Sequence, residues 1–330
     1  MSISIRPNPP FRCLIVSAEG KIGHTRQAEA IAARLGADTS VVPALDARHL
    51  QAGDDALAAA DIILAAGRQS IAPARRIARF FRKAPQRPLV VVLQPVLWRP
   101  QDFDLIWAPA HDRPPRLLPR PRNLVQTLTA PASADPAALA AAAAQLAATT
   151  DVGPRPRVGV LVGGPSAAHR FGSAEVDELA ARLAAFAALH HVSLMVSTSR
   201  RTPAGTAETI AARLAGEQHF VFDAARTGPL APATVFSAIL HLCDAFIVTN
   251  DSVAMLSEVA ATGKPIYGWR LPGGKGKFER LYTGLEAHGA LRWFDGGFAQ
   301  WHYRPLDAAG DVADAIARRM GFTLDDAGRI

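Results

Sequence analysis

The chain has 330 residues, 49% of them hydrophobic and 20% charged, a balance that is typical of soluble globular proteins and leaves room for two domains. Its apolar runs are all shorter than the roughly 18 to 20 residues that a membrane-spanning helix needs, so the sequence predicts no such helix. The formal net charge of +7 favours an anionic partner, although arginine beside abundant alanine is also typical of a biased genomic base composition.

The N-terminal segment has the features of an unprocessed cytoplasmic protein. Its apolar stretch is short, lacks a cleavage-site pattern and leads directly into a strand and a glycine turn. Cys13 and Cys243 lie in separate apolar runs, so we expect buried thiols and neither a disulfide framework nor a cysteine metal site.

In the first half of the chain, apolar runs of strand length alternate with stretches of helical periodicity. The predicted elements are strand 13–16, helix 24–35, strand 61–65, helix 72–82, strand 89–93 and strand 104–107. This alternation is typical of a parallel sheet covered by helices.

The second half repeats the alternation after an alanine-rich helix and a Gly/Pro/Arg spacer within residues 129–157. Its predicted elements are strand 157–162, helix 174–189, strand 192–197, helix 204–215, strand 219–222, helix 232–241, strand 245–248, a helix from Val253, strand 266–269 and a closing helix 308–320. We therefore predict two Rossmann-like, doubly wound α/β domains that face a cleft, with a boundary between residues 150 and 151. The closing helix is expected to pack back on the first domain.

Glycines and a histidine follow the first predicted strand. Gly20 and Gly23 allow a tight turn that brings the backbone close to a ligand, and His24 and Gln27 begin the next helix. His24 is a candidate proton acceptor or donor, although a lone histidine at a helix start is more often a cap or a surface residue. The dinucleotide fingerprint GxGxxG is absent.

The second predicted strand is followed by Arg68 and by a helix with a basic stripe. Arg75, Arg79 and Arg82 are three or four residues apart and therefore share one helix face. A solvated helix face is the ordinary interpretation of such a stripe, and an anionic membrane surface is the functional alternative.

Polar residues also end the next two strands, with Gln94 after one and His111 and Asp112 after the other. Because the carboxyl ends of parallel strands meet at one edge of a sheet, these groups should converge there with His24 and Arg68. His111 and Asp112 thus compete with His24 as the predicted catalytic base.

In the second half, the strand ends carry residue types that bind phosphate. A Gly-Gly turn forms a nest of backbone N–H groups, and arginines beside hydroxyl groups at a helix start supply charge-assisted donors. The candidates are Gly163, Gly164, Ser166, Ser199, Arg200 and Arg201. The alternative interpretation is a pair of tight turns and a capped helix with exposed arginines.

The segment VTNDSVAMLSEVAATGKPIYGW, residues 248–269, contains a strand end, a turn, a helix and the next strand. Its turn places Asp251 and Ser252 at a helix N-terminus, where free N–H groups and a partial positive charge attract phosphate. Either residue is equally well explained as an ordinary N-cap.

The chain resembles the bacterial branch of the family named for the plant mitochondrial fission factor, in the segments SAEGKIGHTRQ, GRQSIAPARR, LQPVLWRPQDFDLIWAPAHD, GGPS, STSRRTP, TNDSVAMLSEVAATGKPIYG and WHYRPL. The resemblance implies a fold similar to the two-domain GT-B glycosyltransferases. Separately, the segment TNDSVAMLSEVAATGKPIY resembles the donor-site segment of those transferases, which implies that Glu258 holds the ribose of a uridine-type nucleotide and that Ser252 and the following N–H groups meet a diphosphate. The segment GKIGH resembles the glycine-rich first loop of that fold, which implies that His24 is the base or another acceptor-side residue.

The leading hypothesis is a metal-independent transferase that takes a sugar from a nucleoside diphosphate sugar of the UDP type, as a substrate and without a further cofactor. Two alternatives stay open: a non-catalytic scaffold that recruits a protein or membrane partner, and a nucleotide-sugar epimerase. A lipid-linked acceptor and peripheral contact with the inner membrane are expected from the basic stripe and the transferase similarity. Nucleic acid is not expected as a partner, because no recognisable motif accompanies the net charge.

Overall fold

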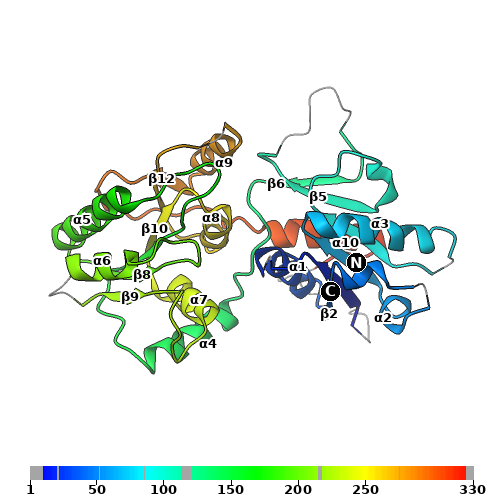
Figure 1. Cartoon of the computed structure of the whole chain (residues 1–330), viewed down its shortest axis with the longest axis horizontal. Helices are drawn as coiled ribbons and strands as arrows, with labels where there is room; N and C mark the ends of the chain where they lie inside the picture. The colour runs from blue at the N-terminus through cyan, green and yellow to red at the C-terminus, as the bar shows by residue number, and fades with distance from the viewer. Residues whose placement is uncertain are drawn as a thin grey trace. The chain divides into compact units, whose positions relative to one another are not determined.

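The computed structural model describes residues 10–20, 22–51, 53–84, 86–112, 120–214, 218–274 and 276–324. The chain forms two compact units, one from residues 1–133 with 307–330 and the other from residues 134–306 (Figure 1). The prediction of an unprocessed N-terminus concerns residues 1–20, of which residues 1–9 lie outside the described ranges.

The first unit is a parallel sheet of six strands in the order β2-β1-β3-β4-β5-β6. The strands are β1 (Arg12–Ser17), β2 (Asp38–Pro43), β3 (Ile62–Ala66), β4 (Leu89–Leu93), β5 (Leu105–Pro109) and β6 (Leu124–Thr127). The helices are α1 (Ile22–Arg34), α2 (Asp55–Ala58), α3 (Ile71–Phe80) and α10 (Ala308–Met320), with short 3-10 turns at Asp46–Arg48, Arg68–Ser70 and Pro100–Asp102.

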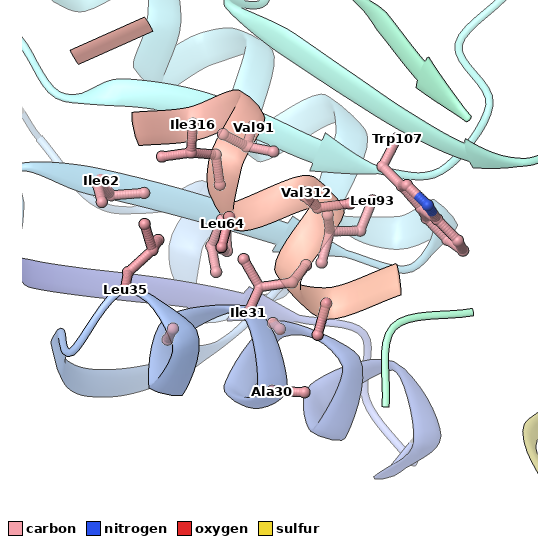
Figure 2. Close-up of a cluster of buried hydrophobic side chains, with 14 of the residues drawn as sticks. Ala30, Ile31, Leu35, Ile62, Leu64, Val91, Leu93, Trp107, Val312 and Ile316 are labelled. Carbon is pink, nitrogen blue, oxygen red and sulfur yellow. The ribbon is translucent and has the colours of Figure 1, made fainter. Parts of the chain in front are cut away.

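The central strands of this sheet are buried on both faces, which explains why they read as continuous apolar runs. On one face, Leu64 and Val91 belong to one buried cluster with Ile31 of α1 and with Val312 and Ile316 of α10 (Figure 2). Alternate residues of the same strands form a second core with α2 and α3 on the other face.

The closing helix α10 belongs to the first unit and lies beside α1. Asp307 caps α10 by accepting a hydrogen bond from the Gly310 N–H at 2.9 Å, and its carboxylate also pairs with Arg34 of α1. At the other end of the helix, Arg319 donates to the Asp104 carbonyl oxygen at 2.6 Å. The chain therefore returns to its first unit after completing the second.

The second unit is also a parallel sheet of six strands, in the order β12-β11-β10-β7-β8-β9. The strands are β7 (Arg157–Leu161), β8 (Ser193–Ser197), β9 (Phe220–Phe222), β10 (Ala245–Thr249), β11 (Ile266–Trp269) and β12 (Leu291–Trp293). The helices are α4 (Pro136–Ala147), α5 (Ser173–His190), α6 (Thr206–Arg213), α7 (Pro232–Leu242), α8 (Val253–Ala260) and α9 (Gly276–Ala287). The predicted class of two doubly wound parallel sheets is confirmed.

The boundary between the units lies between residues 133 and 134 rather than between 150 and 151. The alanine-rich helix α4 belongs to the second unit because it packs against α7, with Ala142, Ala143 and Leu146 buried. Small side chains allow two helices to approach closely, so this apolar helix is a packed element and not the end of the first domain.

Strands β2, β6 and β12 and helices α2 and α9 were not predicted. β2 is an exposed edge strand and β12 has three residues, so neither shows the continuous apolar run of a buried strand. Both cysteines are buried and unpaired, as predicted, and burial raises the pKa of the Cys13 thiol to about 12. Among the described residues, no helix combines the length and the apolar character needed to cross a bilayer.

Candidate functional site

The strand order of the second unit indicates where a ligand should bind. The chain runs outward from β7 to β8 and β9, and then returns to β10 on the other side of β7. In open parallel sheets, ligands bind beyond the carboxyl ends of the strands at such a reversal. Here the loop after β7 meets the turn after β10.

The buried carboxylate of Asp251 joins the loops at this reversal. Its Oδ2 atom accepts hydrogen bonds from the Gly164 N–H at 2.9 Å and from Arg201 Nη2 at 2.7 Å, and its side chain has 0% exposure. Arg201 Nη1 lies 3.1 Å from the carbonyl oxygens of Gly164 and Pro165, to which it donates. The positive charge of Arg201 is therefore largely offset within the protein.

Gly163 and Gly164 occupy positions where no larger residue fits. A Cβ at Gly163 would lie 2.2 Å from Asp251 Oδ1, and a Cβ at Gly164 would lie 2.1 Å from the Arg201 carbonyl oxygen. The Gly163 N–H donates to Thr249 Oγ1 at 2.7 Å. Both glycine N–H groups thus have partners inside the protein, which favours the tight-turn interpretation over the predicted phosphate nest.

The turn after β10 is held by neighbouring elements. Tyr282 of α9 donates its hydroxyl to the Asn250 carbonyl oxygen at 2.6 Å, and Asn250 Oδ1 accepts from the Leu271 N–H at 2.9 Å. Ser252 caps α8 by accepting from the Met255 N–H at 3.3 Å. The first-turn N–H groups of α8 therefore begin at a fixed point beyond the sheet edge.

The loop after β8 contains three of the predicted phosphate ligands. We expected Ser199, Arg200 and Arg201 just before the start of a helix over 204–215, but α6 begins at Thr206, after Gly205 with a φ of 83°. The left-handed backbone of Gly205 ends the loop and separates these residues from the helix. They are consequently loop residues, not helix N-terminal residues.

A threonine organises this β8 loop. Thr202 Oγ1 donates to the Gly163 carbonyl oxygen at 2.5 Å and accepts from the Ser199 N–H at 2.8 Å. Arg200 is exposed and forms no ion pair with any residue in the described part of the chain. Among the arginines at this edge, Arg200 therefore differs from Arg201 in keeping its charge available to a ligand.

His169 is a site residue that the sequence interpretation missed. It follows β7 in the loop with Ser166, whose Oγ accepts from the His169 N–H at 3.1 Å, and it is 3% exposed. It forms an isolated β-bridge with Gly273, beyond the end of β11, and its Nε2 has no hydrogen-bond partner among the described residues. A Cβ at Gly274 would lie 3.9 Å from that Nε2 and 3.8 Å from Glu279 Oε1. The sequence signal that could have indicated this site is Gly273-Gly274, because a glycine pair after a strand marks a place where another loop can approach the backbone closely.

Burial lowers the pKa of His169, while the carboxylates of Asp251 and Glu279 act in the opposite direction and Arg201 adds to the lowering. The ring is therefore neutral at neutral pH and presents a nitrogen that can donate or accept a proton.

This lowered pKa predicts an acid-sensitive contribution to stability. Because the unfolded state binds a proton at His169 more readily, stability is expected to fall as the pH drops below about 6.5, the unfolded pKa, and through the lower folded pKa. Urea unfolding at about pH 7.5 and about pH 5.5 should show a smaller loss for His169→Asn than for the native protein. The matched variant His302→Asn, at an exposed position, should behave as the native protein does. An identical loss in His169→Asn and in the native protein would contradict the assignment.

Glu258 lies on α8 and is half-buried. It follows Ser252 by six residues, or about 9 Å of helix at the usual rise. A ligand that reaches both the start of α8 and Glu258 must therefore extend along the side of the helix, as a nucleoside diphosphate can.

In the first unit, the order of strands reverses between β1 and β3, and His24 lies at this reversal. A Cβ at Gly67, which follows β3 with a φ of 93°, would lie 3.2 Å from the His24 ring and 2.7 Å from Ala18 after β1. Gly20 forms the turn before α1 with a φ of 67°. Gly23, His24 and Gln27 belong to α1 itself.

The other predicted residues of the first unit follow neighbouring strands. Arg68 comes after β3, Gln94 after β4, and His111 with Asp112 after β5. These strands are parallel and adjacent, so the residues share the carboxyl edge of the sheet, as predicted. His111 is buried at 5% exposure, whereas Arg68 is exposed.

Comparison with known proteins agrees with the fold. The UDP-GlcNAc 2-epimerase of Methanocaldococcus jannaschii matches with a TM-score of 0.53 and 10% identity, over 94% of this chain and 99% of the other. MurG of Acinetobacter baumannii matches with a TM-score of 0.47 and 14% identity, over 96% and 97% of the respective chains. At this identity, the likeness to the epimerase shows a shared GT-B-like fold and nothing of the activity.

The sequence comparisons are more specific. The mitochondrial fission protein ELM1 of Arabidopsis thaliana is 28% identical over 281 residues, which cover 78% of this chain. The matched part is 64% of the plant protein, so the chain spans less than two thirds of that relative's length. The family model described as mitochondrial fission ELM1 matches residues 22–320. This range covers most of the chain and all the candidate site residues except Gly20, and the chain therefore belongs to the mitochondrial fission ELM1 family.

Proposed function

We propose that the second unit binds a nucleoside diphosphate sugar of the UDP type and that the protein is a glycosyltransferase-like enzyme. The observation that carries this proposal is the rigid turn after β10, which starts α8 at the reversal of strand order. A helix N-terminus at that position offers N–H groups and a partial positive charge to a phosphate.

Electrostatics supports a diphosphate near Arg200. The charge of Arg201 is offset by Asp251, whereas Arg200 is exposed on the neighbouring loop. We assign the leaving diphosphate to Arg200 and to the first turn of α8, which would stabilise developing negative charge by preorganised donors. This assignment makes the proposed transfer independent of a metal ion. Glu258, farther along α8, would accept hydrogen bonds from the ribose hydroxyl groups.

The acceptor side is proposed in the first unit. His24 lies at the reversal between β1 and β3 and is the first candidate for the base that removes the acceptor proton, with His111 and Asp112 as competitors. A base must come within hydrogen-bond reach of the hydroxyl that it activates. We propose a lipid-linked acceptor from the transferase resemblance of the TNDSVAMLSEVAATGKPIY segment.

Nucleotide binding tests the proposal. Thermal shift and calorimetry with UDP, GDP, ADP, CDP and their common sugars should reveal saturable binding of UDP and a UDP-sugar. Glu258→Ala should weaken this binding about 10- to 100-fold, because a hydrogen bond to a charged group contributes about 1.5–3 kcal/mol. Glu178→Ala, at an exposed position of α5, is the matched control and should bind as the native protein does. Binding that survives both Glu258→Ala and Arg200→Ala would refute the assignment.

A second candidate function is a non-catalytic scaffold, which the fission role in the plant relative's name favours. Turnover separates the candidates: a transferase releases UDP with an acceptor, an epimerase changes the sugar without releasing UDP, and a scaffold does neither. Binding of a UDP-sugar without either reaction, across lipid-linked and soluble acceptors, would favour the scaffold.

A further inference from the structure

The first unit contains a strongly basic segment that belongs to a different sheet from the proposed donor site. Residues 71–104, which include α3, β4 and the loop after β4, contain seven lysines and arginines and two aspartates. The segment thus has a formal charge of +5, compared with +7 for the whole chain. Much of the basic character of the protein is therefore concentrated here.

A cavity of about 410 Å³ lies within this segment. It is lined by four arginines and two aspartates: Arg79, Arg82, Arg87, Arg99, Asp102 and Asp104.

Part of the positive charge in this cavity is already balanced. Arg87 binds Asp104 through two hydrogen bonds of 2.9 and 2.6 Å, and Arg79 lies 3.6 Å from Asp102. Arg82 and Arg99 have no carboxylate partner in the part of the chain that the structure describes. The cavity therefore offers two uncompensated guanidinium groups to an external anion.

Exposed apolar side chains flank this cavity. Leu97 and Trp98 are 59% and 61% exposed, and Phe80 at the end of α3 is 40% exposed. The Trp98 ring has the guanidinium groups of Arg75 and Arg99 at 4.8 and 4.9 Å from its centroid. Tryptophan is favoured where one side is apolar and the other is polar, and here its ring also holds two arginines close to the exposed loop.

Arg75 of α3 holds the loop that exposes Leu97 and Trp98. Arg75 Nη2 donates to the Trp98 carbonyl oxygen at 2.6 Å, and Arg75 Nε lies 3.0 Å from Asp102. Arg99 has a φ of 49°, in the left-handed region that non-glycine residues rarely adopt. The protein thus maintains a costly backbone conformation that presents two large apolar residues to solvent.

These contacts correct the predicted basic stripe. Arg75 is turned inward, with a side chain that is 14% exposed, and Arg82 lies beyond the last residue of α3, Phe80. The cationic surface consequently comes from the end of α3 together with the loop after β4, and not from one face of a helix.

We propose that the Leu97–Trp98 loop and the arginine cavity dock on a bilayer that contains anionic lipids. Arg82 and Arg99 bind the phosphate of a lipid headgroup, while Leu97 and Trp98 enter the interfacial region where tryptophan is favoured. Weak apolar insertion and a polybasic surface give stable but reversible binding only in combination. The adjacent placement of both features favours a lipid surface over a protein partner.

Vesicle sedimentation tests this docking. The full chain should sediment with vesicles of phosphatidylcholine and phosphatidylglycerol, should remain in the supernatant with phosphatidylcholine alone, and should be released by salt. Failure to sediment with the anionic vesicles would overturn the proposal, and so would equal binding to both kinds of vesicle. Because UDP binding is measured separately, failure here leaves the proposed donor site untouched.

Two variants locate the binding. Arg82→Glu combined with Arg99→Glu should weaken sedimentation at least about 25-fold, because each basic residue near an anionic surface contributes about fivefold, or ~1 kcal/mol. Trp98→Ser should weaken it about tenfold, the effect of losing one exposed aromatic anchor of ~1.4 kcal/mol.

Matched controls come from the second unit. Arg213→Glu changes charge at an exposed site on α6, and Leu189→Ser removes an apolar side chain that is 69% exposed. Both should sediment like the native protein. Circular dichroism would establish that each variant is folded, and if Arg82→Glu/Arg99→Glu did not fold, Arg82→Ala would replace it with about a fivefold loss expected. If Arg82→Glu/Arg99→Glu and Trp98→Ser lost no more vesicle binding than the two controls, the proposal would be overturned.

Discussion

Replacing Gly164 with alanine is expected to destabilise the second unit by at least about 3 kcal/mol, which places it at the upper end of overpacking effects. The added Cβ would lie 2.1 Å from the Arg201 carbonyl oxygen and 2.8 Å from its Cβ. Because the first of these atoms is backbone, relief requires a shift of the loop after β8. Thr202 of that loop donates a hydrogen bond to Gly163 in the loop after β7, so the loop cannot move without breaking this bond.

Thermal unfolding measures this effect. A loss of about 3 kcal/mol in a unit of this size lowers the midpoint by roughly 6 to 12 °C. The matched variant is Gly228→Ala, since a Cβ at Gly228 would meet no atom within 4 Å and Gly228 does not have a positive φ. That control should stay within about 0.5 kcal/mol of the native protein. Equal midpoints for the two variants would show that the β7 and β8 loops are not in this close contact.

Replacing Asp251 with alanine should lower the free energy of unfolding by about 2 to 3 kcal/mol. The carboxylate has 0% exposure and is the acceptor for both the Gly164 N–H and Arg201. Its removal leaves the N–H without its acceptor in a partly buried position. The Arg201 side chain is 46% exposed, so water can solvate the released guanidinium and the loss stays below that of a fully buried pair.

A double-mutant cycle with Arg201→Ala isolates the ion pair, and chemical denaturation supplies the four stabilities. We expect a coupling energy of about 1 kcal/mol or more for a pair with a fully buried partner. Glu208→Ala is the matched control, because Glu208 pairs with Arg226 where both side chains are largely exposed, at 47% and 68%. Its effect should be within about 0.5 kcal/mol. If Asp251→Ala lowered the free energy of unfolding by no more than Glu208→Ala does, the contacts of Asp251 would not stabilise the second unit.

The fold class could be predicted because the central strands are buried on both faces. Runs such as Ile62–Ala66 and Ala245–Thr249 are continuously apolar, and the intervening helices show helical periodicity. Strand β2, by contrast, is exposed at the sheet edge along most of its length, so its residues bear no apolar pattern. The alanine-rich α4 could not be assigned to a domain, because its partner α7 lies about ninety residues later in the chain.

The sequence predicted where the candidate site lies, but not which hydrogen bonds and ion pairs its residues form. Parallel strands bring their carboxyl ends to one edge, so polar residues after successive strands could be grouped from the sequence. Ser252 could also be recognised as a helix cap, which it is. Nothing local indicated that Asp251 would bind Arg201 or that the glycine N–H groups would be occupied by Thr249 and Asp251.

Local periodicity and strand-end chemistry were thus enough to identify two parallel doubly wound units and the edge where a ligand should bind. Long-range contacts decided the rest, because Arg201 and Asp251 are separated by 50 residues, and His169 meets Gly273 across a still longer separation. Such pairs depend on strand order and on the backbone angles of glycines such as Gly273, with a φ of 105°. They determine which polar groups are bound within the protein and which, such as Arg200, remain exposed to a ligand.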